Sequence, residues 1–306
     1  MKKNRFIKIA AVVFTLCLIT TCGISSTLAK YTTSSSASDT ARVAKWGVEV
    51  SASGTMFGKA YQTTIVAEDD ANATVRTVNS IHSSNLVAPG TKNDTGIVIK
   101  VIGSPEVEFK LSATIDTVAS DIYLVKGDYG VMLPANGVNH ATDLEAENIY
   151  ILNGSNYVKA TTFDAAATYY KLTDMATVSE DRYYPIKWTA SVVENGSYFD
   201  ANPETLKDAL DLLVNGINEY VDRFSTTGTF DPNTSISLIY KLTWAWSFDG
   251  NDGADTILGN LMAEDQGILG NGVVVKLDGS NYVAIADSDY NLSVGCGFSV
   301  SATQVN

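Results

Sequence analysis

The sequence has few of the residue types that carry catalytic and metal-binding chemistry. Its 306 residues include two histidines, His82 and His140, and three cysteines, with no His-Glu-x-x-His motif. Structural zinc sites of cysteine and histidine are excluded by this count, and a His-rich catalytic zinc site nearly so. Neither histidine adjoins a Gly-x-Ser-x-Gly elbow, and the glycine motifs of nucleotide-binding proteins are absent. The sequence therefore predicts a protein that is not an enzyme and binds no organic cofactor.

Positive charge is also scarce. The chain has 21 Lys and Arg against 34 Asp and Glu, a net charge of −13. Removal of an N-terminal leader that carries Lys2, Lys3, Arg5 and Lys8 would leave 17 basic against 34 acidic residues, a net charge near −17. Binding to phosphates requires clustered Lys and Arg. Nucleic acid is therefore not expected as a partner.

Residues 1–29 have the layout of a secretory signal peptide. Basic residues precede an apolar run that starts at Ile9, and Thr27-Leu-Ala29 offers small residues for cleavage after Ala29. Two alternatives are an uncleaved membrane anchor and a lipoprotein modified at Cys22, although Thr21 is bulkier than the residue usual before a lipidated cysteine. We expect a protein that is secreted to the extracellular matrix or cell surface, with no stable membrane anchor in the mature chain.

Cleavage would leave Cys296 as the one cysteine of the mature chain. An intramolecular disulfide is then impossible, so stability must come from the hydrophobic core. Cys296 lies in phase with apolar residues of the last alternating run, which predicts a buried, inert thiol.

Alternation of apolar and polar residues with period two dominates the chain after the leader and predicts strands with one buried face. The alternating runs are residues 44–50, 107–115, 236–248 and 290–302. A more continuous apolar run at residues 97–102 predicts a strand covered on both faces. Because such runs occur at both ends of the chain, the first and last segments should meet in space. The sequence predicts a mostly β fold, a jelly-roll-like antiparallel β-sandwich.

Helical patterns and turns interrupt these strands. Asn202 and Pro203 start a pattern that predicts an amphipathic helix over residues 203–225, and a shorter helix is expected near residues 254–263. Asn153-Gly154 and Asp278-Gly279 predict β-hairpins, each with the pentapeptide Gly-Ser-Asn-Tyr-Val. We therefore divide the chain into a flexible segment at residues 30–42, a sandwich core at 43–117 and 231–306, and an insertion at 118–230 that holds hairpins and the long helix.

The densest polar cluster is Asp249-Gly-Asn-Asp-Gly-Ala-Asp255. Oxygen ligands from Asp249, Asn251, Asp252 and Asp255 could bind calcium, although their spacing is not that of an EF-hand loop. The alternative is that Asp252 or Asp255 caps the following helix. Trp244 and Trp246 could stack on glycans, but their phase with Leu242 favours the core.

Several motifs together resemble a known family of exported proteins. Leu28-Ala-Lys-Tyr31 and Asp39-Thr-Ala-Arg-Val-Ala-Lys-Trp46 follow the leader, Leu86-x-x-Pro-Gly-Thr91 precedes a strand, and Trp244-Ala-Trp-Ser-Phe248 leads into Asn251-Asp-Gly-Ala-Asp-Thr256. With the terminal Phe298-Ser-Val-Ser-Ala-Thr-Gln-Val305, these segments resemble the TasA and camelysin (CalY) family of Gram-positive bacteria, whose leaders are removed by a signal peptidase of the SipW type. The resemblance covers about the first hundred and the last seventy residues.

The resemblance implies a secreted subunit of biofilm-matrix fibres, in which the freed N-terminal segment completes the sheet of a neighbouring copy. An open sheet edge has unpaired backbone groups that such a segment could fill. The candidate assembly residues are Lys30, Tyr31, Ser34, Ser36, Asp39 and Arg42. The expected partners are other copies of the chain and an accessory matrix protein.

Two further functions compete with the matrix subunit. A surface adhesin or glycan- or protein-binding module would use the tyrosine-rich middle region, with Tyr150, Tyr157, Tyr169, Tyr170, Tyr183 and Tyr184 as its contact surface. Camelysins have also been described as metalloproteases, but no metal motif in this sequence supports that activity.

Overall fold

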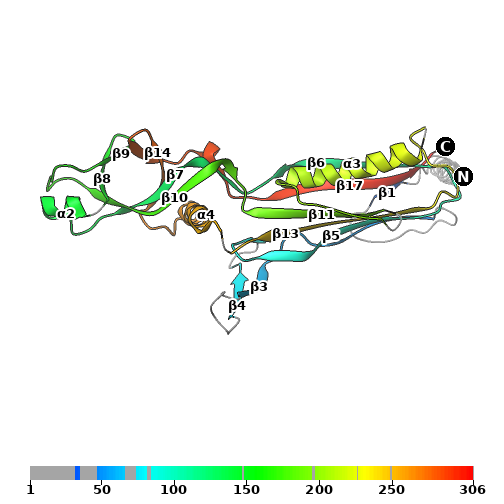
Figure 1. Cartoon of the computed structure of the whole chain (residues 1–306), viewed down its shortest axis with the longest axis horizontal. Helices are drawn as coiled ribbons and strands as arrows, with labels where there is room; N and C mark the ends of the chain where they lie inside the picture. Colours follow the sequence, from blue (N-terminus) through cyan, green and yellow to red (C-terminus); the bar gives the residue numbers. More distant parts are fainter. Residues whose placement is uncertain are drawn as a thin grey trace, which may run out of the picture.

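The computed structural model shows a mostly β protein, with 51% of residues in strands and 18% in helices. It describes residues 32–34, 47–65, 74–80, 84–146, 148–194, 197–225, 227–248 and 250–305. Figure 1 shows an elongated molecule with a sandwich-like body at one end and a smaller lobe of strands at the other. The predicted mostly β, sandwich-like fold is therefore confirmed.

The body has two facing layers. The first is an antiparallel sheet in the order β12 (Ser197–Ala201), β11 (Ile186–Glu194), β13 (Ile236–Trp246), β5 (Lys92–Gly103) and β2 (Val48–Gly54). The second is the antiparallel sheet β1 (Thr32–Ser34), β17 (Gly295–Gln304) and β6 (Phe109–Ser120), extended by helix α3 (Leu206–Phe224). Helix α3 packs against both β6 and β11 and runs alongside β6 and β17 in Figure 1. The helix thus takes the place of further strands in the second layer.

Alternation along β13 supplies the centre of the core, as predicted. Every second residue from Ile236 to Trp246 is buried, and Trp244 lies opposite the buried Trp188 of β11. Phe248, which we predicted to share this face, lies beyond the end of the strand and is 46% exposed.

Two of the predicted runs differ from the structure. Strand β5 buries Ile99 and Val101 but leaves Ile102 41% exposed, so the prediction of two covered faces is wrong. The second layer covers this sheet on one face, which is why one face of β5 is buried. The run at residues 290–302 is not one strand: it divides into β16 (Tyr290–Asn291) and β17, because residues 292–294 connect the two lobes.

Helix α3 confirms the predicted long helix but begins three residues later than expected. Its N-cap is Thr205, whose hydroxyl accepts from the Asp208 N–H at 3.1 Å and donates to the Asp208 carboxylate at 2.7 Å. Asn202, the predicted cap, instead accepts a hydrogen bond from Thr189 on β11. The buried stripe packs on the sandwich core and comprises Leu206, Ala209, Leu210, Leu213, Ile217, Tyr220 and Val221.

The smaller lobe is a closed ring of strands. Its order is β10 (Tyr169–Tyr183), β8 (Ile149–Asn153), β9 (Asn156–Lys159), β15 (Asn281–Ala284), β14 (Val273–Asp278) and β7 (Tyr123–Pro134), and β7 pairs with β10 again. We call it the barrel lobe. Helix α4 (Asp252–Asp265) packs against β7, β10 and β14, and β16 pairs with β7. The short helices α2 (Ala141–Ala146) and η1 (Asp287–Asp289) lie in its connections.

The repeated pentapeptide forms two equivalent hairpins that pair with each other. Gly154 and Gly279 have φ values of +65° and +62°, and each begins the two-residue Gly-Ser turn of its hairpin. Glycine at that position is typical of a type II′ turn. Strand β9 of the first hairpin pairs with β15 of the second, which places Tyr157 opposite Tyr282. The predicted hairpins are confirmed, and together they supply four of the six strands of the barrel ring.

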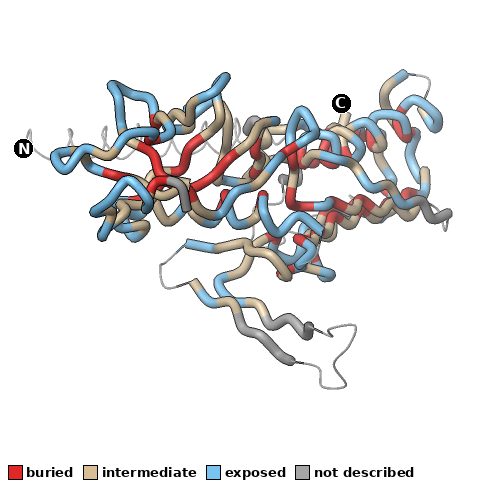
Figure 2. The backbone as a smooth tube through the Cα atoms, turned by 60° about the vertical axis from the view of Figure 1, so that its left-hand side comes forward, coloured by how far each residue is buried: buried red, intermediate tan, exposed pale blue. Residues whose placement is uncertain are grey.

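The chain crosses between the sandwich and the barrel lobe four times. The crossings lie between β6 and β7, β10 and β11, β13 and α4, and β16 and β17. This differs from the predicted division in two ways. We expected β11, β12 and α3 in the insertion at residues 118–230, but they belong to the sandwich. We expected α4, β14 and β15 in the sandwich, but they belong to the barrel lobe. Figure 2 shows buried backbone inside both lobes. The hairpin of β3 (Ala60–Ile65) and β4 (Thr74–Asn79) projects from the body beside the junction.

Candidate functional site

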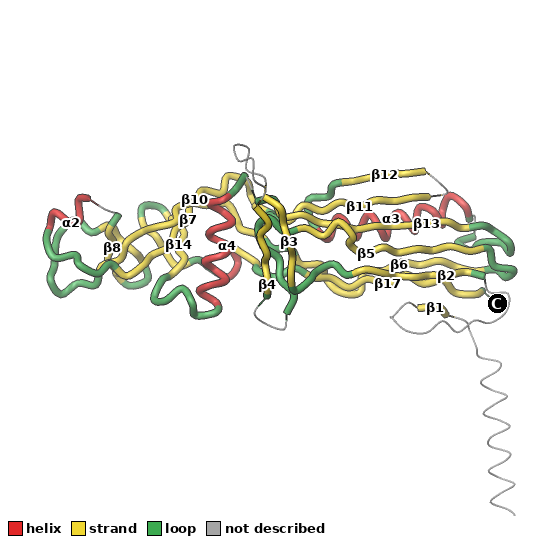
Figure 3. The backbone as a smooth tube through the Cα atoms, turned by 90° about the horizontal axis from the view of Figure 1, so that it is seen from below, coloured by secondary structure: helices red, strands yellow, loops and turns green. Residues whose placement is uncertain are grey.

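The predicted assembly segment is described only at Thr32–Ser34, which forms β1. Thr32 lies opposite Thr303 of β17, Thr33 opposite Ala302, and Ser34 opposite Ser301. The other candidate residues, Lys30, Tyr31, Ser36, Asp39 and Arg42, and the predicted cleavage site at Ala29 lie outside the described residues. In this chain, β1 therefore lies on the β17 edge of the chain's own second layer (Figure 3).

Strand β17 has little protection against addition of another strand. Its ten residues contain neither a charge nor a proline, the residue types that commonly block edge pairing. Strand β1 pairs with three of the ten. Among the described residues, no strand pairs with residues 295–298 on the side away from β6. Most of the length of this edge is therefore not paired by β1.

Hydroxyl groups bridge β17 and β6 on one face of the second layer. Ser112 and Ser301 lie 2.8 Å apart, and Thr114 and Ser299 lie 2.9 Å apart. Cross-strand hydroxyl pairs of this kind contribute to strand pairing. They fix the register of β17, so the position of its outer edge is well defined.

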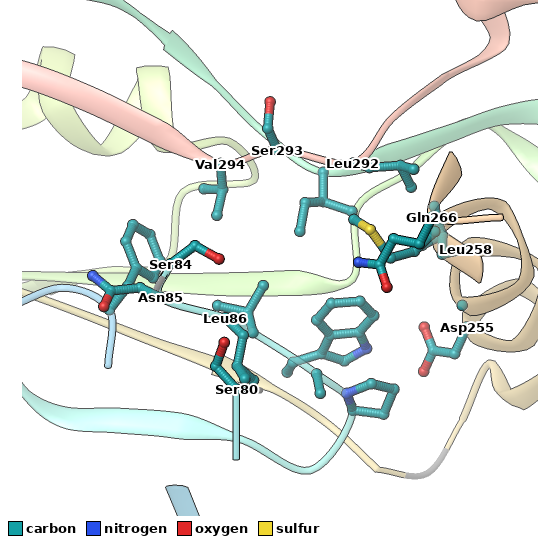
Figure 4. A pocket seen from close by; sticks show the side chains of 18 of the residues that line it. Ser80, Ser84, Asn85, Leu86, Asp255, Leu258, Gln266, Leu292, Ser293 and Val294 are labelled. Carbon is teal, nitrogen blue, oxygen red and sulfur yellow. The ribbon is translucent and has the colours of Figure 1, made fainter. Parts of the chain in front are cut away.

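A pocket of about 550 Å³ lies at the junction of the sandwich and the barrel lobe. We call it the junction pocket. Its lining includes the segment before β5, Trp246 at the end of β13, helix α4 and the crossing before β17. Figure 4 shows Asp255 and Leu258 of α4 with Gln266 on one side, and Ser84, Asn85 and Leu86 on the other. This volume lies within the range of small-molecule sites.

Asp255, one of the calcium candidates, lies in the wall of this pocket. Its carboxylate accepts a hydrogen bond of 2.8 Å from the hydroxyl of Tyr183. Burial raises the pKa of the Asp255 carboxyl, and the hydrogen bond from Tyr183 opposes that shift. Burial and the adjacent Asp255 carboxylate raise the pKa of Tyr183. The raised pKa keeps Tyr183 protonated, as its role as the donor in this hydrogen bond requires.

The other calcium candidates are described in part, so the calcium site stays a prediction. Asn251 is the N-cap of α4, Asp252 is in its first turn, and Asp249 lies outside the described residues. Within the ranges that the structure describes, no three Asp, Glu, His or Cys side chains group as metal ligands would. The predicted cap also differs, because Asn251 precedes the helix while Asp252 and Asp255 lie in its first turn, where their charge suits the helix dipole.

A second half-buried carboxylate, Asp121, holds the junction on its sandwich side. It follows β6 and accepts hydrogen bonds of 3.0 Å from the indole N–H of Trp188 and the backbone N–H of Leu206, the first residue of α3. Its own carbonyl accepts from the Asn291 amide at 2.6 Å. Burial raises the pKa of the Asp121 carboxyl, and the two donated hydrogen bonds act against this rise. Asp121 thus ties the crossing after β6 to β11, to α3 and to β16.

Comparison with known proteins found no match among family models, curated proteins or solved structures. The resemblance to the TasA and camelysin family therefore rests on its sequence motifs and stays a prediction. In the part of the chain that the structure describes, no helix combines the length and the hydrophobicity needed to cross a bilayer.

The tyrosines proposed as a contact surface are mostly inside the protein. Tyr150, Tyr157, Tyr169 and Tyr183 are each at most 8% exposed, which contradicts a stacking role for these four. Tyr150 packs against Tyr282 and Tyr157 against Tyr170 in edge-to-face contacts, and these four rings belong to the core of the barrel lobe. Trp244 and Trp246 are also buried, as the strand phase predicted.

The residues considered for nucleophilic chemistry are described in part. His140 is exposed just before α2, and its backbone N–H donates to Asp143; His82 lies outside the described residues. Cys296 is half-buried against the sandwich core, and burial raises the pKa of its thiol. A raised thiol pKa lowers the fraction of reactive thiolate, which agrees with the prediction of an inert cysteine.

We expect each of the two carboxyls with a raised pKa to contribute stability that appears in mild acid. A carboxyl whose pKa is higher in the folded protein than in the unfolded chain binds its proton more tightly in the folded protein. Its contribution to the free energy of unfolding therefore grows as pH falls toward the ordinary pKa of 3.8. That contribution is lost as pH rises through the folded pKa. Urea unfolding of the wild type and Asp255→Asn between pH 7 and pH 4 measures this effect. The wild type should gain more stability than the variant; parallel curves would show that Asp255 makes no such contribution.

Proposed function

We propose that this protein is a secreted structural subunit of an extracellular matrix, and that copies assemble by exchanging β1. The observation that carries the proposal is the pairing of a three-residue strand with an edge strand of ten residues that lacks charge and proline. Export is the expectation from the leader, and a signal peptidase of the SipW type would release the segment that contains β1. An accessory matrix protein would be a further partner.

The backbone arrangement makes exchange inexpensive in free energy. A β1 strand from a second copy would form the same pairs, Thr32 with Thr303 and Ser34 with Ser301, that β1 forms within one chain. Exchange of an identical element creates no new kind of interface, so it is a low-cost route to assembly. The chain that links Ser34 to Gly47 could extend over roughly 40 Å. The balance between exchange and self-pairing then depends mainly on protein concentration.

Directional assembly follows from the position of the two parts. Each copy has one β1 to give and one β17 edge to receive it. When a donor and an acceptor are different surfaces of one chain, their contact is head-to-tail and leads to rings or open filaments. Backbone hydrogen bonds provide the affinity in strand addition of this kind. Reciprocal exchange between two copies would give a closed dimer, whereas donation of each β1 to a further copy gives an open filament, the arrangement that we propose.

Disulfide trapping tests the exchange between copies. In mature protein carrying Cys296→Ser, one population carries Ser34→Cys and a second carries Ser301→Cys; the two positions are paired in the structure. Mixing and mild oxidation should give a disulfide-linked heterodimer whose yield rises with concentration. Ser112→Cys, one strand further from β1, is the matched control, because a second strand spacing puts it about 10 Å away, beyond disulfide reach.

Electron microscopy of a double variant completes the test. Ser34→Cys with Ser301→Cys in one chain, oxidised at low concentration, should lock β1 onto its own β17 and prevent filaments, and reduction should restore them. Deletion of residues 30–42 should prevent filaments under both conditions. Filaments that grow equally well from the locked protein would disprove exchange of β1, and wild-type protein that stays monomeric at high concentration in all salts would disprove self-assembly.

A further inference from the structure

The outer face of the five-stranded sheet carries a lysine on each of its three central strands. Lys187 of β11, Lys241 of β13 and Lys100 of β5 each lie between two buried residues of their strand, so their side chains point away from the core. We call these three residues the lysine row. Figure 3 views the molecule from this side, with β11, β13 and β5 in front of α3. Among the elements that the structure describes, none covers this face.

The carboxylates of this face lie at its margins. Glu49 is on the edge strand β2 and Asp200 is on the edge strand β12, while Asp94 is in an ion pair of 2.7 Å with Lys92 at the start of β5. No member of the lysine row is in an ion pair with another described residue. The chain as a whole has 34 Asp and Glu against 21 Lys and Arg. The centre of this face is therefore a local positive surface on an acidic protein.

The opposite side of the sandwich carries negative charge. Helix α3 buries one stripe, and the helical period places six residues on the side away from the core: Asp208, Asp211, Leu212, Asn215, Glu219 and Asp222. We call them the acidic side of α3. It has four carboxylates and no cation, because Lys207 pairs with Asp211 from the flank and Arg223 binds Glu194 of β11. Leu212, which is 37% exposed, adds an apolar contact.

The two surfaces match in length. The end members of the lysine row lie opposite Ala245 and Ile239, six residues apart on β13, and the row crosses two strand spacings. At about 3.4 Å per residue and about 4.8 Å per strand, this diagonal is about 22 Å long. The acidic side of α3 extends from Asp208 to Asp222, about 21 Å at the rise of an α-helix. A helix laid along the row would place carboxylates along its whole length.

We propose that the lysine row binds the acidic side of α3 of a second copy of the chain. Leu212 of that copy lies against Val98 and Ile239, which are the strand partners of Lys241 and Lys100. Because the two surfaces lie on opposite sides of one sandwich, each copy offers both, and the contact is head-to-tail and open-ended. It joins copies side by side and uses neither β1 nor β17, so it is separate from the proposed strand exchange.

The charges of the contact predict how it responds to salt. Exposed ion pairs are individually weak, and salt screens them. A single contact of this kind is therefore weak, but many copies aligned along a filament would add their contacts. An acidic polysaccharide would be attracted to the same lysines, but it would not require the acidic side of α3. The second copy is favoured by the match in both length and charge.

Charge reversal outside the core tests the contact. Lys100→Glu with Lys241→Glu reverses the lysine row, and Glu219→Lys with Asp222→Lys reverses the acidic side of α3. Lysine is favourable in the last turns of a helix, so the second pair should not destabilise α3. A chain with all four substitutions has the net charge of the wild type, with the two surfaces exchanged in sign.

Sedimentation velocity of the locked variant, Ser34→Cys with Ser301→Cys, measures the association without exchange of β1. The locked protein should self-associate at about 0.1 M salt, and 1 M salt should weaken this at least tenfold. Reversal of either surface alone should also weaken it at least tenfold, and reversal of both in one chain should restore it. Lys126→Glu with Lys159→Glu, at exposed positions of the barrel lobe, is the control for net charge and should leave the association unchanged.

The proposal is overturned if the locked protein stays monomeric at all concentrations in low salt. It is equally overturned if the fourfold variant associates no better than the single reversals, or if the barrel-lobe control weakens association as much, because net charge would then explain the effect. A monomeric locked protein that binds polygalacturonate through the lysine row would assign this face to an acidic polysaccharide instead. Filaments of the unlocked protein are a separate readout, so failure here leaves the exchange of β1 untouched.

Discussion

Asp121→Ala is expected to lower the free energy of unfolding by about 2–5 kcal/mol. The substitution removes the acceptor of two donors, the Trp188 indole N–H and the Leu206 backbone N–H. Trp188 is 1% exposed and Leu206 is fully buried, so water cannot easily replace the carboxylate. The start of α3 would also lose the negative charge that favours a helix N-terminus. Urea unfolding followed by tryptophan fluorescence measures the change.

Asp128→Ala is the control for this prediction. Asp128 is on β7, and its carboxylate accepts one hydrogen bond of 2.6 Å from the exposed hydroxyl of Thr177. Exposed partners can turn to water, so the cost should stay below about 1 kcal/mol. Equal losses in the two variants would mean that Asp121 has no special role at the junction.

Gly96→Ala should be the most damaging single-methyl change in the sandwich, at about 2–5 kcal/mol. Gly96 has a φ of +58°, and a Cβ there would lie 1.9 Å from the carbonyl oxygen of Leu242 on β13. The register of β5 and β13 shifts at this point, between the pairs of Leu242 and Trp244. The methyl group would have to separate two central strands. Thermal and urea unfolding both report the loss.

Gly154→Ala separates the two causes of this loss. Gly154 has a similar φ of +65°, but a Cβ there meets no atom within 4 Å. It should cost only the left-handed backbone penalty, about 1–2 kcal/mol. If both variants lose the same amount, the close approach of Leu242 to Gly96 contributes nothing to stability.

Local patterns in the sequence predicted the elements that depend on their own residues. The sequence shows the alternation of β13 and the apolar stripe of α3, because the direction of a side chain follows from the period of the backbone. It also shows the two Gly-Ser hairpins, because glycine is favoured in their turns. Boundaries were less predictable. Asn202 and Thr205 are both good caps, and Leu206, which follows the actual cap Thr205, donates its backbone N–H to Asp121, 85 residues away along the chain.

The division into lobes could not be read from order along the chain. Strands can pair in one sheet however far apart they lie along the chain. Strand β14 pairs with β7 and β15 pairs with β9, and both partners lie more than one hundred residues earlier in the sequence. The junction pocket could not be predicted either, because its lining residues are also far apart along the chain. Leu86, Trp246, Asp255 and Leu292 share no local motif, and their convergence is a product of the four crossings. For the assembly segment, composition alone indicated which residues belong to it. The strand edge with which it pairs, that of β17, is visible only in the structure.

The barrel lobe lies at the end of the molecule away from the paired part of β1, since β17 begins next to that lobe and receives β1 at its other end. A filament held together through β1 and β17 would therefore transmit tension through the sandwich alone. The barrel lobe would bear none of this tension. Mechanical strength and the chemistry of the barrel lobe could then change independently of each other.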